Sequence, residues 1–217
     1  MTTVIFVRHG YSEGNLTDSF HGHTDGDLTP LGHKQAALAA QYLKNRKIDA
    51  LYSSDLQRAY KTALHIADEL SLDIIKDKRL REIMAGEWEG KKFSELEELF
   101  PEEYKIWFND PGNFVSPGGE SMKQLYDRMT STVADIVKQN KDKTIVIATH
   151  ATPIRTLNCH WMGKDVCAFN ETEWVSNASI CEINYEIKDD ESVVPHPVCI
   201  NYCEHLGELS TSLADNI

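Results

Sequence analysis

Short apolar runs alternate with longer stretches of helical periodicity along most of the chain. The runs at 4–7 and 144–149 are continuous and rich in β-branched residues, which is typical of strands buried on both faces of a sheet. Patterns with a period of 3.6 residues predict amphipathic helices between the strands. The expected strands are 4–7, 50–53, 72–75, 144–149, 180–187 and 198–202. The expected helices are 30–46, 55–70, 93–109, 120–140 and 153–162.

Capping residues, prolines and glycines indicate where the predicted helices begin and end. Thr29 is a favourable N-cap, and Pro30 is favourable at the first helical position. Asp55 can cap the second helix, and Pro101 is expected to break the third. Glycine and proline also predict loops. The expected loops are 80–90 and 110–119.

The alternation of strands and helices predicts an α/β fold: a three-layer α/β/α sandwich with a mostly parallel central sheet and helices on both faces. We expect one domain, 1–217, with a variable cap at about 91–119 and an unassigned tail at about 203–217. The last dozen residues show no pattern and are expected to be loosely held. Ligands bind beyond the carboxyl ends of parallel strands. His9 and His150 are both expected at that edge.

The charge balance limits the partners of the protein. The chain has 22 Lys+Arg against 34 Asp+Glu and a net charge of −12. Nucleic acids and anionic membranes are bound through clustered basic residues, so neither is an expected partner. Any anion must therefore bind in a local basic pocket, whose positive charge opposes the negative charge of the protein as a whole.

The start of the sequence and the cysteine pattern together predict a cytoplasmic protein. The start lacks a basic lead-in and a long apolar run, so we expect no secretory signal or membrane span. Five cysteines lie in the last third of the chain without paired zinc-ligand spacing. We interpret them as reduced thiols of a cytoplasmic protein. A Cys199–Cys203 bridge stays an unsupported alternative.

The triplet Arg8-His9-Gly10 carries the first candidate chemistry. An imidazole attacks a phosphoryl group when one nitrogen is unprotonated and the proton on the other is held by a hydrogen bond. The neighbouring guanidinium offers planar donors that match phosphate oxygens, and glycine lets the backbone approach a ligand. A strand-end histidine beside a solvated arginine would give the same triplet. Its position after the first strand favours the catalytic interpretation.

Several further blocks follow in order and together carry a specific resemblance. They resemble the signature of the histidine phosphatase (phosphoglycerate mutase-like) superfamily. The blocks are Val4 to Gly10, Asn15, Phe20 to Asp25 with Leu28 to Gly32, Ser53 to Ala59, Leu80 to Ile83, and Thr149-His150-Ala151.

The resemblance implies a role for each candidate site residue. His9 is the implied nucleophile, and Glu82 is the implied acid that protonates the leaving alcohol and later deprotonates water. Three further residues are implied to hold the phosphoryl oxygens, because phosphoryl transfer depends on positioning and charge. These are Arg8, Arg58 and His150. The implied substrate contacts are Gly10, Asn15, His21, His23, Thr149 and Ala151.

Each role has a simpler structural alternative. Glu82 alone could be a solvated carboxylate, and Arg58 could pair with Asp55 on a helix surface. His21 and His23 have a spacing that could suit a metal, but a pocket-lining or solvated role is favoured. The family needs no metal and no cofactor, and we expect neither here.

Departures from the mutase pattern favour the phosphatase branch. Gly14 stands where mutases have tryptophan, and the segment 82–90 resembles the phosphatase form. The span from Glu82 to His150 is short and lacks the basic insertion of mutases. We therefore expect hydrolysis of phosphomonoesters of small metabolites through a phosphohistidine. A cofactor-dependent phosphoglycerate mutase is the alternative, and a non-catalytic phosphate-ligand-binding module is the second.

The sequence leaves the substrate and the oligomeric state open. The expected ligands are a small phosphorylated metabolite and inorganic phosphate, and a homodimer is one alternative. The tail after Tyr185 could cover the sheet edge or mediate such a contact. Several aromatic residues are expected to be mostly core, with one or more lining the substrate pocket. They are Trp88, Trp107, Phe108, Phe114 and Trp174.

Overall fold

A six-stranded sheet forms the centre of the computed structural model, which describes residues 1–211. The strand order is β3-β2-β4-β1-β5-β6. Pairings among β1 to β4 are parallel, whereas β5 and β6 are antiparallel. The expected α/β class is therefore confirmed, with a mixed sheet. The strands are β1 (Thr2–Arg8), β2 (Ala50–Ser53), β3 (Ile74–Lys76), β4 (Thr144–Thr149), β5 (Ile180–Ile187) and β6 (Val193–Tyr202).

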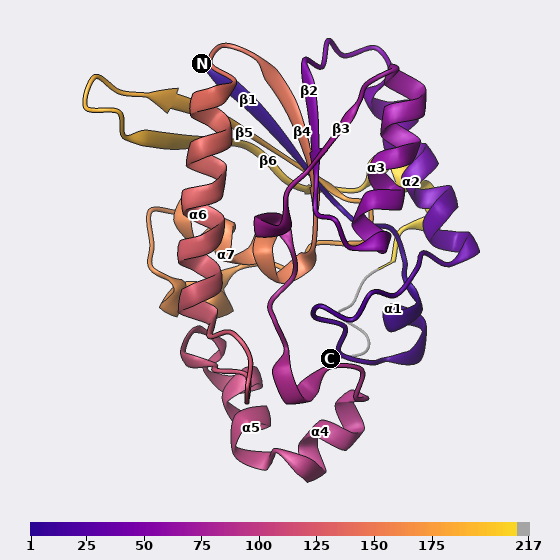
Figure 1. The fold of residues 1–217 in the computed structure, drawn as a ribbon, viewed down its shortest axis with the longest axis vertical. Helices are drawn as coiled ribbons and strands as arrows, with labels where there is room; N and C mark the ends of the chain where they lie inside the picture. Colours follow the sequence, from indigo (N-terminus) through magenta and orange to yellow (C-terminus); the bar gives the residue numbers. More distant parts are fainter. Residues whose placement is uncertain (212–217) are drawn as a thin grey trace.

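Helices cover both faces of the sheet because successive strand residues point to opposite sides (Figure 1). Val4 and Phe6 belong to one buried cluster, together with residues of α6 (Met122–Gln139) and α7 (Ala151–Trp161). Ile5 and Val7 belong to a second cluster, with residues of α2 (Pro30–Leu43) and α3 (Gln57–Leu70). β1 is thus buried from both sides, as its uninterrupted apolar run predicts.

Helix α2 begins as predicted, whereas α3 and α7 begin at other positions for local reasons. The Thr29 hydroxyl accepts a hydrogen bond from the amide of Gly32 at 3.1 Å, so the predicted cap of α2 is confirmed. Asp55 does not cap α3, because both of its carboxylate oxygens accept from Arg81 at 2.6 and 2.7 Å. α7 begins at Ala151, two residues early, since proline is tolerated in the first turn of a helix.

A small helical cap lies beyond the carboxyl edge of the sheet (Figure 1). It contains α4 (Phe93–Leu99) and α5 (Pro101–Asn109), which are separated at Pro101 as expected. A short helix, α1 (Glu13–Thr17), was not anticipated. The loop 80–90 contains Gly86 at φ +53°, where a Cβ atom would collide with the carbonyl of Pro117. The two predicted loops are therefore in close contact below the sheet.

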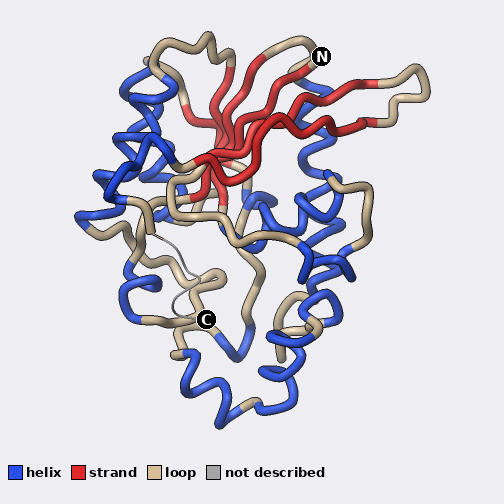
Figure 2. The backbone as a smooth tube through the Cα atoms, turned by 180° about the vertical axis from the view of Figure 1, so that it is seen from behind, coloured by secondary structure: helices blue, strands red, loops and turns tan. Residues whose placement is uncertain are grey.

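The C-terminal part adds an edge strand and a short 3-10 helix. β6 begins five residues before the expected start and includes Pro195 and Pro197, which are tolerated because β6 is an edge strand. Figure 2 shows the β5–β6 hairpin extending away from the body of the molecule. Glu204–Leu209 forms a 3-10 helix against α2, with the Leu209 carbonyl accepting from Gln35 at 2.8 Å. The rest of the predicted tail, 212–217, lies outside the described residues.

Two smaller findings complete the fold. All five cysteines are free thiols, so a Cys199–Cys203 bridge is absent from the described chain. Within residues 1–211, none of the helices has the length and apolar character needed to cross a bilayer.

Candidate active site

Two neighbouring strand ends bring the candidate histidines together. β1 and β4 pair in parallel with Arg8 opposite Thr149, and the amide of His9 donates to the Thr149 carbonyl at 2.9 Å. His9 and His150 follow these paired residues, and their ring centroids are 5.2 Å apart. The parallel register therefore accounts for the proximity of two residues that are far apart in sequence.

The ring of His9 is held in one tautomer. Its Nδ1 lies 2.8 Å from the Gly10 carbonyl, an acceptor, so Nδ1 carries the proton and donates it. Nε2 keeps its lone pair for the pocket that His9 lines. Burial, together with the charges of Arg58 and Arg8, holds the pKa of His9 well below its usual value. His9 is therefore a neutral imidazole with an available nucleophilic nitrogen at neutral pH.

Two buried guanidinium groups give the site its positive charge. Arg8 donates from Nη1 to the Val175 carbonyl, and its buried Nε has no partner among residues 1–211. Arg58 is 1 % exposed and donates to the carbonyls of Thr24, His21 and Gly22 at 2.8–2.9 Å. Neither forms an ion pair with a carboxylate in the described chain. Burial lowers the pKa of both groups, and their positive charge is available to bind an anion.

Arg58 and Glu82 are buried and do not have the surface roles that their local sequence would also allow. Arg58 does not pair with Asp55, whose carboxylate is occupied by Arg81. Glu82 is only 8 % exposed, and it accepts from the amides of Ile83 at 2.8 Å and Thr152 at 3.3 Å. Burial raises the pKa of Glu82, so its carboxyl group keeps a proton to higher pH than a solvated glutamate.

His150 presents a second unsatisfied nitrogen in the same region. The ring is fully buried, and its Nε2 lies 2.9 Å from the Ser54 hydroxyl. Its Nδ1 has no partner among residues 1–211. Burial and the charge of Arg58 hold the pKa of His150 well below its usual value. Orphaned groups at His150 and Arg8 fit a site that is completed by the oxygens of a bound anion.

The pocket has a polar side and an aromatic side. The polar residues that line it include Arg8, His9, Arg58 and Glu82 together with Ser12, Asn15, Ser19, His21 and Thr152. The aromatic residues that line it are Phe20, Phe93, Trp107 and Trp174. The structure therefore brings a cluster of polar and charged groups beside an apolar wall.

The predicted substrate contacts divide into two groups. Asn15, His21 and Ala151 line the pocket. Gly10 and Thr149 do not line it, and neither does the predicted catalytic residue His150. At Gly10 a Cβ atom would collide with the carbonyl of Gly32, so close packing of α2 requires glycine there.

His23 lies outside the pocket. Its Nε2 is 3.0 Å from the Glu82 carbonyl, and the ring lines a separate surface depression beside Arg128. The pair His21 and His23 therefore points in two directions, and a shared ligand contact does not follow from their spacing.

Sequence reasoning missed a buried asparagine that supports the site. Asn177 is fully buried and donates from Nδ2 to the His9 carbonyl at 3.2 Å and to Oδ1 of Asn15 at 3.1 Å. Ser12 donates to the same Oδ1 from its amide and its hydroxyl. Asn15 is therefore oriented with its oxygen occupied. The only sequence signal was the Asn-Ala-Ser segment, and burial of Asn177 speaks against its use as a glycosylation site.

Comparison with known proteins identifies the class to which this fold and site belong. The sequence profile of the histidine phosphatase superfamily (branch 1) matches residues 4–194. The chain therefore belongs to this superfamily, and the expected family membership is confirmed.

Individual relatives cover nearly all of the chain. Phosphoserine phosphatase 1 of Hydrogenobacter thermophilus is 35% identical over 211 residues, which are 96% of each chain. The structure of Bacillus stearothermophilus YhfR superposes with a TM-score of 0.88 at 25% identity, covering 95% of this chain and 100% of that one. A mycobacterial glucosyl-3-phosphoglycerate phosphatase in complex with VO3 gives a TM-score of 0.84 at 27% identity, covering 92% and 99%.

Proposed function

We propose that the protein hydrolyses phosphomonoesters of small metabolites through a phosphohistidine intermediate formed on His9. One observation carries the proposal: the neutral His9 lines a pocket together with two buried arginines and the buried carboxyl group of Glu82. These are the nucleophile, the charge stabilisers and the proton donor that phosphoryl transfer to an imidazole needs. The names of the relatives support the same reaction class.

In the first step, Nε2 of His9 attacks the phosphorus of the bound ester. A nitrogen–phosphorus bond forms while the bond from phosphorus to the ester oxygen breaks. The protonated carboxyl of Glu82 delivers its proton to the leaving alkoxide, so the product departs as a neutral alcohol. The Gly10 carbonyl holds the Nδ1 proton and stabilises the charge that develops on the ring.

In the second step, water replaces the alcohol. The Glu82 carboxylate removes a proton from that water, whose oxygen attacks phosphorus and breaks the bond to Nε2. Inorganic phosphate leaves, while His9 returns to the neutral form and Glu82 to the protonated form. Arg8 and Arg58 line the pocket and stabilise the phosphoryl oxygens in both steps, since they are preorganised before substrate arrives. His150, whose Nδ1 has no partner among residues 1–211, is the third proposed contact of these oxygens.

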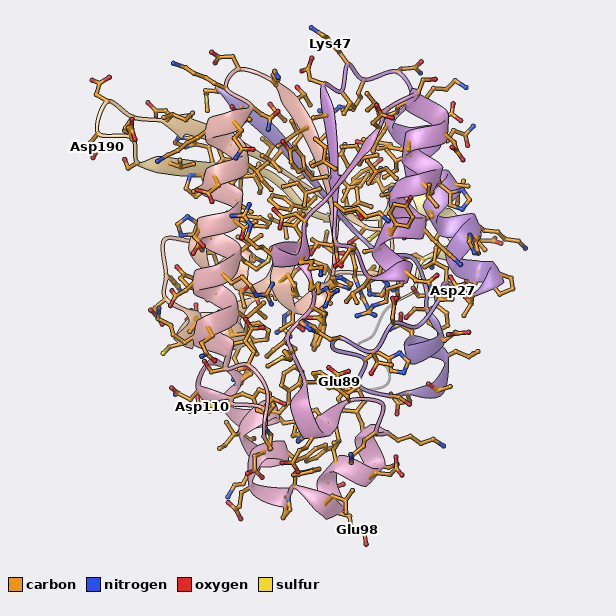
Figure 3. The ribbon with its side chains drawn as sticks, viewed as in Figure 1. Asp27, Lys47, Glu89, Glu98, Asp110 and Asp190 are labelled. Atoms are coloured by element: carbon orange, nitrogen blue, oxygen red, sulfur yellow. The ribbon has the colours of Figure 1, made fainter. Side chains whose placement is uncertain are left out.

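The pocket favours hydrolysis over a mutase reaction. Among the described residues, Arg8 and Arg58 are the only arginines that line it, and no lysine does. The second phosphate of a bisphosphorylated intermediate would therefore have no cationic partner there. The cap is acidic, and Glu98 lies at its far end in Figure 3. A mutase remains the second candidate because a phosphoglycerate mutase-like protein of Arabidopsis thaliana is 38% identical over 71% of this chain and 68% of its own length.

The substrate class rests on named relatives and their complexes. Structures of Entamoeba histolytica phosphoserine phosphatase contain phosphoserine or 3-phosphoglyceric acid, with TM-scores of 0.81 and coverage of 95% of this chain. Phosphoserine and 3-phosphoglycerate are therefore the first metabolites to test.

The five free thiols support activity in the cytoplasm.

The deciding experiment measures phosphate release from a panel of phosphomonoesters beside the conversion of 3-phosphoglycerate to 2-phosphoglycerate. We expect release without interconversion. Efficient interconversion with little release would establish the mutase, and phosphate binding without turnover of any ester would establish the non-catalytic module.

A further inference from the structure

Arg155 is a buried cation that the proposed reaction does not use. It lies in α7, one helical turn beyond Ala151, and is 5 % exposed. It donates from Nε to the Thr172 hydroxyl at 3.1 Å and from Nη2 to the carbonyls of Phe169 and Thr172 at 3.3 and 3.2 Å. No carboxylate pairs with it among residues 1–211, and burial lowers its pKa. Burying an unpaired charge is costly, so its position calls for an explanation.

The guanidinium lies over two aromatic rings. Its central carbon lies 4.0 Å from the Phe169 ring centroid and 4.1 Å from the Trp174 ring centroid. Both distances are well inside the range of favourable cation–π contact. Lysine could not reproduce this arrangement, because only a planar group can stack on two rings and donate at its edge.

Hydrogen bonds to backbone carbonyls also hold the segment that contains Trp174. Its carbonyl accepts from Nδ2 of Asn201 at 3.2 Å, and the carbonyl of the next residue, Val175, accepts from Arg8. The segment that carries the indole is therefore held between the buried Arg155 on one side and an arginine of the proposed catalytic site on the other.

The indole stands between the pocket and Arg155. Trp174 and Trp107 line the pocket that contains His9, and they also line a second hollow whose wall includes Arg155 and Phe169. Arg155 itself does not line the first pocket. Of the two tryptophans shared by the hollows, Trp174 is the one whose ring the Arg155 guanidinium contacts, so we expect an influence of Arg155 on substrate to pass through Trp174.

We propose that Arg155 is a positioning residue that holds Trp174 as a wall for the alcohol half of the substrate, and that it thereby favours esters with a planar or apolar alcohol group. This inference rests on the proposed phosphatase function. Once the phosphoryl group occupies the Arg8 and Arg58 side, the alcohol half must extend toward the aromatic side. A preordered indole offers contact there without loss of side-chain entropy on binding.

The test compares 2-naphthyl phosphate, which has a planar alcohol group, with glycerol 1-phosphate. Arg155→Met keeps the length of the side chain but removes its plane, charge and donors. We expect KM for 2-naphthyl phosphate to rise about tenfold, with kcat for both esters and KM for glycerol 1-phosphate within about twofold of wild type. Trp174→Ala, which removes the proposed wall itself, should raise KM for 2-naphthyl phosphate by at least as much. The double variant should add little to it, because both changes remove one unit.

Two further variants keep the test decisive. Arg155→Lys preserves the charge and should not restore the KM for 2-naphthyl phosphate. Arg46→Met is the matched control, since Arg46 makes a bidentate pair with Glu182 at 2.7 and 2.8 Å and does not line the pocket. Its selectivity should equal that of wild type. Hydrogen–deuterium exchange over 166–175 should accelerate in Arg155→Met and stay unchanged in Arg46→Met.

Equal losses on both esters in Arg155→Met would overturn the inference, as would additive effects in the double variant or full rescue by lysine. Absence of turnover by the wild type on any ester would instead refute the proposed function. In that case calorimetric binding of 2-naphthyl phosphate to wild type and Arg155→Met still decides the positioning role. Equal affinities would refute it.

Discussion

The polar and aromatic sides of the pocket are built in different ways. Arg8 ends a strand that is buried on both faces and His9 follows it, and backbone carbonyls hold both side chains. The aromatic side comes from a loop, two short cap helices and the segment after α7. Its members are Phe20, Phe93, Trp107 and Trp174.

The two sides also make opposite contributions to stability. The polar side buries two cations without a carboxylate pair in the described chain, which opposes folding. The aromatic side continues the hydrophobic core, with the Trp107 ring centroid 4.9 Å from that of Phe114 and 5.1 Å from that of Phe20. The proposed chemistry is therefore placed where the fold is strained electrostatically, and recognition is placed where the fold is well packed.

The largest expected effect comes from His9→Ala. The variant should lose at least about 1000-fold in kcat, because the nucleophile is removed while the surrounding charges remain. Incubation with a radiolabelled ester should no longer give acid-labile, protein-bound phosphate. Circular dichroism should show an intact fold, since the change is at a strand end. Retained turnover would remove His9 from the mechanism.

Glu82→Gln should have the next largest effect, about 100- to 10,000-fold on esters with poor leaving groups. The loss should be much smaller for p-nitrophenyl phosphate, whose leaving group needs little protonation. Similar losses on both kinds of ester would contradict the role as a general acid.

The pH dependence of kcat/KM tests the same carboxyl group. Burial raises the pKa of Glu82, so the protonated acid persists above pH 4.5 and is lost as the pH rises through the raised value. The pKa of His9 is lowered, so the neutral nucleophile is already present below pH 6.5. For a poor leaving group we expect an acidic optimum with a fall toward alkaline pH. That fall should disappear in Glu82→Gln, and its persistence would assign it to another group.

Arg8→Met should separate binding from stability on the polar side. Phosphate at about 100 times its Kd should stabilise the wild type by about 2.7 kcal/mol in thermal unfolding. The variant should lose most of this shift. Without phosphate it should be more stable than wild type by about 1 kcal/mol, because an unpaired buried charge is gone. A less stable variant would show that the Val175 hydrogen bond outweighs the buried charge.

Phe93→Ala should have the smallest effect, on the aromatic side alone. Phe93 is partly buried and lines the pocket, so we expect a rise in KM of about threefold for 2-naphthyl phosphate with kcat nearly unchanged. Phe100→Ala is the control, because Phe100 belongs to the same cap and packs on Trp88 without lining the pocket. Equal KM changes in the two variants would indicate a general loosening of the cap.

Local sequence signals were sufficient for most of the polar side. The apolar runs predicted β1 and β4, and the motif blocks singled out Arg8, His9, Arg58 and Glu82, all of which line one pocket. These signals are local because each residue sits at or just after a strand end, in a loop or in the first turn of a helix. His23 shows the limit, since two loop residues separated by one position can point to different surfaces.

The sequence by itself therefore determined the family, the α/β class and the residues that carry the proposed chemistry. Only the tertiary structure decided that Asn177 supports Asn15 and that Arg155 stacks on Trp174. It also decided that Asp55 pairs with Arg81 instead of capping α3. The physical reason is that these contacts join segments from 19 to 162 residues apart. Their partners are chosen by packing and by competition between hydrogen-bond acceptors, and neither leaves a periodic trace in the chain.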